Sequence, residues 1–318
     1  MDVGKVILYK NIKGDDKKIV ILEKIGQGAY GIVFKAMLEN YGLIALKVQK
    51  LLPETLQSLL QSLKSEIKIS EVLPENIAIS LKKVLFHTGQ GKPSEMVSVT
   101  DDVPKNYVAT LYDLADGLEL QKLIDINKNA GLVLSEDVIE RYIRDLLQCL
   151  EGLKSVGVAH RDIKPGNLML NKGNIIMIDF GFACFYVECT GKKGTPKFLP
   201  PEFFFLPQIN WQKGDIFAMG ITIISLITNG NTLYENYFQT KEQASGFFSV
   251  YTTDELRAKF IGTMDKYALK YPVINTYREL ILGMIDPEPM TRWTIEQCFE
   301  WIDMKTYGRI LDVTEDES

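Results

Sequence analysis

Residues 160–167 read His-Arg-Asp-Ile-Lys-Pro-Gly-Asn, and residues 179–181 read Asp-Phe-Gly. Either segment alone is a weak signal, since a tripeptide such as Asp-Phe-Gly also occurs in simple turns. The two segments stand at a fixed spacing, behind a glycine-rich segment and a strand that carries a lysine. Chance is a poor explanation for this combination. The side chains that could carry chemistry here are Asp162, Lys164, Asn167 and Asp179.

A glycine-rich segment, Gly-Gln-Gly-Ala-Tyr-Gly-Ile-Val, occupies residues 26–33. Glycines let a backbone approach phosphates closely and adopt positive φ angles. The spacing of the three glycines is weak by itself, because dinucleotide-binding folds carry it between a strand and a helix. Here a strand-like run continues over residues 31–37. A flap over nucleotide phosphates, set between two strands, therefore fits better than a dinucleotide-binding turn. Taken alone, the segment could equally be a plain glycine-rich hairpin turn.

Lys47 lies near the end of the next strand-like run, where its charge could neutralise the α- and β-phosphates of a nucleotide. A lysine has a long flexible stem and needs a partner to hold it in place. Glu66 is the best candidate, because it shares the inward face of a helix predicted from the apolar spacing of residues 56–67. Glu71 is the alternative, and either glutamate could instead be a solvated surface charge.

Apolar and β-branched runs predict strands early in the chain, and helical periodicity dominates after about residue 115. Ser135 is a plausible helix N-cap, and the apolar stripe that follows it ends at Gly157. This order favours a small β-rich lobe followed by a larger α-rich lobe. The predicted strands cover residues 19–25, 31–37, 43–48, 79–86, 96–100 and 106–112.

The composition narrows the class of protein. The chain has 318 residues, of which 46% are hydrophobic, and a net charge of −5, which argues against general nucleic-acid binding. The N-terminus lacks the apolar core of a signal peptide. The apolar run at 216–228 is shorter than the roughly 20 residues of a membrane-spanning helix, so a buried core helix is expected. Four cysteines form no CxxC pair and predict reduced thiols without a zinc site: Cys149, Cys184, Cys189 and Cys298.

With these motifs in place, the sequence resembles the eukaryotic protein kinase superfamily over residues 19–302. Further matches are the Gly-Thr-Pro…Pro-Glu segment at 194–202, the Asp215 segment and the late Asp-Pro…Arg element at 286–292. The resemblance implies an α+β bilobal fold, with a β-rich N-lobe that carries one main helix, an α-rich C-lobe and an ATP cleft between them. The implied boundaries are an extension at 1–18, the N-lobe at 19–110, a hinge at 111–114, the C-lobe at 115–305 and an acidic tail at 306–318. Its last residues, 315–318, are expected to be frayed.

The resemblance also implies the reaction, which is transfer of the γ-phosphate of ATP to Ser or Thr hydroxyls of proteins. Asp162 would accept the hydroxyl proton, Lys164 would balance charge, and Asn167 and Asp179 would bind Mg²⁺. Lys164 and Thr195 match Ser/Thr rather than Tyr kinases. The alternatives are a pseudokinase that serves as a binding or scaffold module, and a kinase for small molecules or lipids. The presence of Lys47, Asp162 and Asp179 weighs against a pseudokinase.

By the same resemblance, Val33, Ala45 and Met169 would sandwich the adenine ring, and Thr110 would stand at the gatekeeper position ahead of the hinge. The full set implied to contact the nucleotide is Ile25, Gly26, Gln27, Gly28, Ala29, Tyr30, Gly31, Ile32, Val33, Ala45, Lys47, Thr110 and Met169.

Other residues receive structural roles from the resemblance. Glu202 and Arg292 would form a buried ion pair, and Asp215 would anchor the backbone of the catalytic loop. His160 and Phe180 would stack in a spine that links the lobes. Ser70 stands where a bulky apolar residue is usual in this spine, so activation could need a partner.

Regulation and substrate choice stay open at this point. Arg161 could pair with phosphorylated Thr190, or Glu188 could supply a standing negative charge instead. Three lysines at 192, 193 and 197 are either a solvated loop surface or a preference for acidic residues near the acceptor. The expected partners are protein substrates, with no nucleic acid and no membrane, in the cytoplasm or nucleus.

Overall fold

The computed structural model describes every residue except 1–2, 29–30, 51, 53, 55, 88–92, 96–106, 235–237 and 317–318, and except the side chains of 87 and 307–316. Ala29, Tyr30 and the strand predicted at 96–100 lie outside the described residues. The chain divides into two compact units, Met1–Asp116 and Gly117–Ser318.

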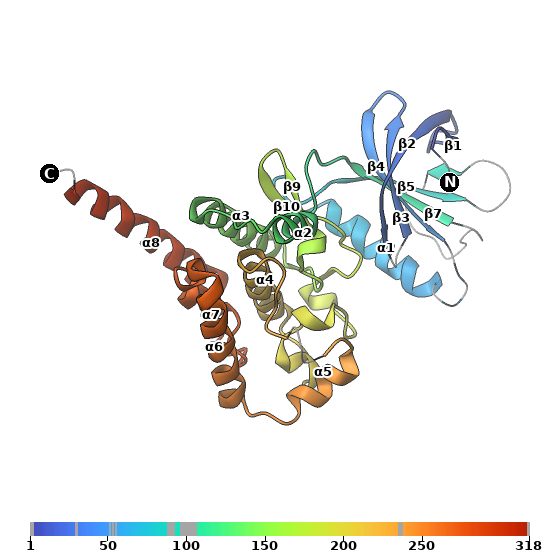
Figure 1. Cartoon of the computed structure of the whole chain (residues 1–318). Helices are drawn as coiled ribbons and strands as arrows, with labels where there is room; N and C mark the ends of the chain where they lie inside the picture. The colour runs from blue at the N-terminus through green and yellow to red at the C-terminus, as the bar shows by residue number, and fades with distance from the viewer. Residues whose placement is uncertain are drawn as a thin grey trace. The chain divides into compact units, whose positions relative to one another are not determined.

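The N-terminal unit is built on a closed sheet of strand order β1-β2-β3-β4-β7-β5-β6 (Figure 1). Side chains alternate between its two faces, so one apolar set fills the interior of the barrel, including Ile19, Phe34, Ile44 and Leu111. The strands are β1 Val6–Lys10, β2 Asp16–Gly28, β3 Gly31–Leu38, β4 Gly42–Lys50, β5 Leu81–His87, β6 Ser94–Glu95 and β7 Tyr107–Asp113.

The one helix among the described residues of this unit, α1, spans Leu56–Ser70 and confirms the helix predicted from apolar spacing. Its residue Leu63 packs on Val84, Phe86 and Val108, on the outer face of the sheet. Residues 1–18, interpreted above as an extension, contain β1 and the first residues of β2. β1 pairs antiparallel with β2 and parallel with β6, so this segment is part of the sheet.

The C-terminal unit is mainly helical (Figure 1). Its α-helices are α2 Leu120–Ala130, α3 Glu136–Ser155, α4 Trp211–Ile227, α5 Lys241–Phe248, α6 Thr253–Lys270, α7 Arg278–Met284 and α8 Ile295–Asp316. Its strands are β8 Val158–Ala159, β9 Leu168–Asn171, β10 Asn174–Met177 and β11 Cys184–Phe185. Short 3₁₀ helices are η1 Pro165–Asn167, η2 Tyr186–Glu188, η3 Pro196–Phe198, η4 Pro201–Phe204 and η5 Pro272–Asn275.

Helix α4 forms the centre of this unit and is apolar on all sides, so nearly every residue in it is buried. This confirms the core helix expected at 216–228. Within the described chain, no helix has the length and apolar content needed to cross a membrane. The apolar stripe of α3 is also buried, and Ser135 takes the N-cap position, although its side chain makes no capping hydrogen bond.

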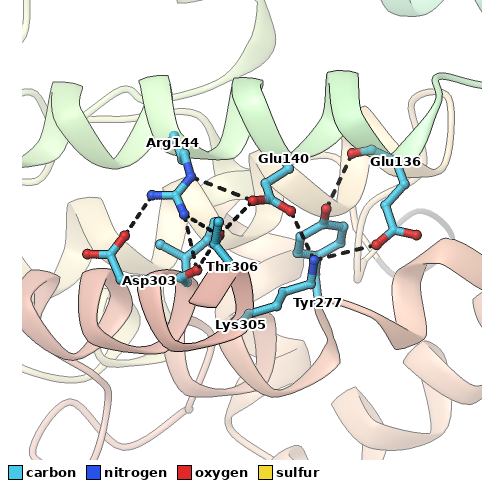
Figure 2. A network of polar contacts seen from close by, with 8 residues as sticks. Glu136, Glu140, Arg144, Tyr277, Asp303, Lys305 and Thr306 are labelled. Carbon is cyan, nitrogen blue, oxygen red and sulfur yellow. Dashed lines mark hydrogen bonds and ion pairs between the residues drawn. The ribbon is translucent and has the colours of Figure 1, made fainter. Parts of the chain in front are cut away.

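The acidic tail expected from residue 306 is helical as far as Asp316, where α8 ends, and residues 317–318 lie outside the described residues. A polar network fixes α8 against α3 (Figure 2). Arg144 Nη1 lies 2.7 Å from Asp303 Oδ1, and Lys305 Nζ lies 3.0 Å from Glu140 Oε2. Thr306 donates to Glu140 Oε1 at 2.9 Å. The acidic composition of the segment does not prevent helix formation.

The prediction of four reduced thiols is wrong. Cys184 and Cys189 form a disulfide, whereas Cys149 and Cys298 are buried free thiols. The bond spans β11 and η2, because the 3₁₀ turn brings the chain back toward the end of the strand. Cys184 is fixed on β11 by the antiparallel pairing of this strand with β8.

Candidate active site

The segment at residues 160–167 directly follows β8, and the side chain of Asp215 on α4 holds its backbone in place. Oδ2 of this carboxylate accepts a hydrogen bond from the backbone N–H of His160 at 2.7 Å, and Oδ1 accepts one from the N–H of Arg161 at 2.9 Å. Burial raises the pKa of Asp215 to about 7, against the opposing effect of these two N–H groups. The anchoring role expected of Asp215 is therefore present in the structure.

Asp162 lies at the centre of a compact polar cluster and is only 8% exposed. Lys164 Nζ lies 2.7 Å from Asp162 Oδ2, and the hydroxyl of Thr195 donates to Asp162 Oδ1 at 2.6 Å. Lys164 Nζ also donates to Thr195 Oγ1 at 2.8 Å. The three side chains thus contact one another in a closed triangle, although Thr195 is 33 residues away from Asp162 along the chain.

Asn167 closes the other side of this cluster. Its Nδ2 donates to the backbone oxygen of Asp162 at 2.8 Å and to Oδ2 at 2.9 Å. The carboxylate therefore accepts hydrogen bonds from three different side chains, which fixes its orientation. Both bonds use the amide nitrogen, so the amide oxygen of Asn167 is directed away from Asp162.

Asp179 follows β10, and the backbone brings its segment to Asn167, because Ile178 N–H donates to Asn167 O at 2.9 Å. Asp179 adopts a positive φ of 61°, an uncommon conformation for a residue other than glycine. Within the described residues no group of three or more His, Cys, Asp or Glu could hold a metal. Mg²⁺ needs only one or two carboxylates when phosphates supply further oxygens, so one carboxylate and one amide oxygen fit this ion.

His160 and Phe180 contact each other beside this cluster, with ring centroids 5.0 Å apart. Both rings are nearly fully buried. Burial lowers the pKa of His160, against the opposing effect of the Asp162 and Asp179 carboxylates. The expected contact between the two rings is present, whereas the spine through Ser70 stays a prediction. Ser70 ends α1 in the other unit and donates its hydroxyl to Ile67 O at 2.8 Å.

In the N-terminal unit, the glycine-rich segment is a hairpin between β2 and β3, with Gly28 paired to Gly31. This strand–turn–strand context separates it from a dinucleotide-binding turn, which leads into a helix. Gly31 has a φ of 133°, and a Cβ there would meet the carbonyl oxygen of Val48. Only glycine fits this position. Ile25, Gly26, Gln27, Ile32 and Val33 lie on the same two strands.

The register of the sheet places the remaining candidates side by side. Val33 is opposite Lys47, and Lys47 is opposite Thr110. Ala45 is opposite Tyr112. Cross-strand partners point to the same face of a sheet, so these five side chains share one face. Met169 lies on β9 in the C-terminal unit, and its predicted sandwich with Val33 and Ala45 stays a prediction.

Tyr112 is the residue that sequence reasoning missed. Its hydroxyl donates to Glu66 Oε1 at 2.5 Å, and Glu66 is only 5% exposed. Glu71, the alternative to Glu66, is exposed. Thr110 is fully buried, and its hydroxyl donates to Lys47 O at 3.4 Å. The signal for Tyr112 was its position two residues after Thr110, which puts both side chains on the same face of the strand.

The segment after Asp-Phe-Gly is held by Arg161, whose Nε donates to Phe182 O at 2.6 Å and Nη1 to Thr190 O at 2.9 Å. At the far end of the segment, Glu202 forms a bidentate pair with Arg292, with N···O distances of 2.7 and 2.9 Å. Both side chains are buried. The predicted pairing of Glu202 with Arg292 is confirmed.

Comparison with known proteins agrees with this geometry. A family model described as "Protein kinase domain" matches residues 19–301. A calcium/calmodulin-dependent protein kinase kinase of Caenorhabditis elegans is 32% identical over 248 residues, which are 68% of this chain and 42% of that protein. Serine/threonine-protein kinase 4 homolog A of Dictyostelium discoideum is 28% identical over 70% of this chain and 44% of its own length. The chain spans less than half the length of these relatives, and by its match over residues 19–301 it belongs to the protein kinase domain family.

Proposed function

We propose that this chain is a serine/threonine protein kinase, which transfers the γ-phosphate of Mg-ATP to hydroxyl groups of protein substrates. The observation that carries the proposal is the hydrogen-bonded triangle of Asp162, Lys164 and Thr195. It holds the Asp162 carboxylate and the Lys164 ammonium side by side in fixed positions. The carboxylate can accept the proton of an acceptor hydroxyl, and the ammonium can balance the charge of the phosphoryl group during transfer.

In this proposal Asp162 orients the acceptor hydroxyl and takes its proton, and Lys164 balances the charge of the transferring group. Lys47, with Glu66 as its partner, contacts the α- and β-phosphates, and the β2–β3 hairpin covers them. Asn167 and Asp179 would hold Mg²⁺, which neutralises phosphate charge when bound. Positioning and charge neutralisation supply most of the catalysis in this class of reaction.

A pseudokinase is the second candidate, since the same fold can serve as a binding module. Three residues weigh against it: Lys47, Asp162 and Asp179 are all present. The hydrogen bonds of Asp162 to Lys164, Thr195 and Asn167 weigh further, because a degenerate site has no need of an oriented carboxylate. The two candidates differ in a single observable, which is transfer of phosphate.

The proposed partners are proteins with Ser or Thr acceptors. An activating partner, suggested by Ser70, and phosphorylation of Thr190 stay predictions. The cytoplasmic or nuclear location also stays a prediction. The Cys184–Cys189 disulfide weighs against it, because disulfides persist mainly in oxidising compartments.

The test is transfer of labelled phosphate from Mg-ATP to a generic protein substrate, with Asp162→Asn and Lys47→Met as variants. We expect labelled serine or threonine with the wild type. With each variant, the rate of phosphate transfer should fall by a factor of about 100 or more. Circular dichroism should show all three proteins folded. Asp265→Asn, which changes an exposed carboxylate elsewhere in the C-terminal unit, is the matched control. Wild-type turnover by Asp162→Asn would remove the role assigned to this carboxylate.

A further inference from the structure

Three lysines, Lys192, Lys193 and Lys241, gather at the end of the segment that follows Asp-Phe-Gly; they are called the basic surface below. Lys241 begins α5 (Figure 1), and its Nζ donates to the backbone oxygen of Lys192 at 3.3 Å. The Nζ atoms of Lys192 and Lys241 lie 5.5 and 5.1 Å from the centre of the same aromatic ring, that of Phe203. Residues from two distant parts of the chain therefore bring two ammonium groups to one place.

Lys193 adds a third charge beside Arg161. Its Nζ lies 5.1 Å from the centre of the Phe182 ring. Partial burial, and then the charge of Arg161, lower the pKa of Lys193. Burial likewise lowers the pKa of Lys241, and Lys193 contributes to this shift. Among the described residues, no ion pair joins any of the three lysines to a carboxylate. The carboxylates of Asp162 and Glu242 raise the pKa of Lys241, but less than burial lowers it. Like charges held this close, with no carboxylate at ion-pair distance, favour an anion as ligand.

The basic surface lies next to the site of the acceptor hydroxyl. Lys193 is followed by Gly194, where a Cβ would come within 2.7 Å of the carbonyl oxygen of Arg161. This close approach fixes the segment against the catalytic loop, and Thr195 then contacts Asp162 at 2.6 Å. The carboxylate of Asp162 also raises the pKa of Lys241, against the larger effect of burial, so this ammonium lies within its electrostatic reach.

The aromatic rings give the lysines defined positions. Phe203 is only 2% exposed and is packed against Trp211, so its ring is a fixed support. A cation over an aromatic ring is attracted by the ring electrons. A lysine held in this way loses less conformational freedom when it binds an anion, and this favours affinity.

We propose that the basic surface binds an anionic side chain of the protein substrate beside the acceptor, so that the enzyme prefers Ser or Thr flanked by carboxylate or phosphoryl groups. This inference rests on the proposed kinase function and names its substrate class. Its main competitor is binding of the chain's own Thr190 after phosphorylation, because Arg161 already contacts the backbone of that residue.

The first experiment compares peptides that contain one acceptor serine in the same uncharged sequence. They differ only in whether one position beside the serine is Asp, Asn or phosphoserine. Asp and Asn have nearly the same shape, so their ratio isolates charge, and phosphoserine separates a phosphoryl from a carboxylate source. We expect kcat/KM to be about tenfold higher for Asp than for Asn at one or more positions, and the ratio to shrink in high salt. Equal rates for Asp and Asn at every position would overturn the inference. If no peptide is phosphorylated, the proposed function itself fails.

The second experiment removes the charges. We expect the double variant Lys192→Met, Lys241→Met to lose the preference for Asp, while kcat/KM for the neutral peptide stays within about twofold. The double variant with Glu at both positions should instead prefer a peptide with Lys. Lys259→Met is the matched control, because this lysine also lies over an aromatic ring, 4.4 Å from the centre of Tyr251. A preference for Asp that survives both double variants would show that the basic surface does not bind the anionic side chain and would contradict the proposal.

Discussion

The phenolic hydroxyl of Tyr112 donates a hydrogen bond of 2.5 Å to Oε1 of Glu66. The tyrosine lies on β7 and the glutamate on α1, so the bond fixes the helix to the outer face of the sheet within one unit. A buried carboxylate needs hydrogen-bond donors to offset the loss of water. Tyr112 meets part of this need, and it also sets the direction in which Glu66 points.

The first prediction concerns Tyr112→Phe. Loss of the hydroxyl leaves the buried Glu66 carboxylate with one donor fewer, which should lower the free energy of unfolding by about 1–3 kcal/mol. If Glu66 orients Lys47 as proposed, kcat/KM for ATP should fall about tenfold. Thermal unfolding and initial rates at varied ATP concentration measure the two effects.

Tyr41→Phe is the control for this prediction. Tyr41 also donates a 2.5 Å hydrogen bond to a carboxylate, that of Asp113, but at an exposed position. It should change neither quantity appreciably. Equal effects of the two substitutions would mean that burial of Glu66 has no special importance.

The second prediction concerns the buried pair of Glu202 and Arg292. Arg292→Met leaves the Glu202 carboxylate buried without its bidentate partner, which should cost about 3–5 kcal/mol of unfolding free energy. Arg278→Met breaks a pair of similar length, 2.6 Å to an Asp265 side chain that is 61% exposed, and should cost about 0–1 kcal/mol. Urea unfolding followed by fluorescence compares them. A loss of the same size in both variants would refute the distinction between buried and exposed pairs.

The third prediction is a pH dependence from Asp215, whose pKa is raised by burial from 3.8 to about 7. Between these values the folded protein holds a proton that the unfolded chain has released. The contribution of this group to stability is therefore complete below pH 3.8 and is lost as the pH rises through about 7. Asp215→Asn cannot titrate, so its unfolding free energy should change less between about pH 5 and pH 7.5 than that of the wild type.

Asp215→Asn should also be less stable at every pH, because one of the two N–H donors that face it loses its acceptor. The slope against pH, rather than the absolute stability, is therefore the quantity to compare. Asp265→Asn, at an exposed position, should retain the wild-type slope. An unchanged slope in Asp215→Asn would show that this carboxylate does not titrate in the range.

The fourth prediction concerns the Cys184–Cys189 disulfide. Unfolding the protein in an alkylating agent without reductant should label two cysteines, Cys149 and Cys298, and prior reduction should raise the number to four. Because the bond closes a short loop, reduction should lower the unfolding free energy by only about 2 kcal/mol. Mass spectrometry counts the labels. Four labels without reductant would show that the bond is absent.

Much of the fold follows from local sequence patterns. The strands at residues 19–48 and the helices α1, α3 and α4 carry strong apolar periodicity, and the structure has them where the patterns predict. The cluster around Asp162 was also predictable, because its members belong to short motifs. Thr195 is the exception, because it lies 33 residues after Asp162 in the sequence. Only the family resemblance linked these two residues.

What could not be predicted depends on contacts between distant parts of the chain. The importance of Tyr112 depends on the register of β7 against β4, which no local pattern specifies. The disulfide depends on the 3₁₀ turn between its cysteines. Helix α8 continues past residue 306 while Arg144, 159 residues earlier, pairs with Asp303. An acidic composition gives no indication of such a partner.

The closed sheet of the N-terminal unit has a consequence for self-association. An open sheet presents a free row of backbone N–H and C=O groups at its edge, and these can recruit a strand from another molecule. In this unit β1 covers β2 on one side and meets β6 through the pairing of Lys10 with Ser94, with Lys10 N–H donating to Pro93 O at 2.9 Å. One residue pair joins β1 to β6, so the five residues of β1 leave the sheet of this unit without the free edge on which another molecule could add a strand.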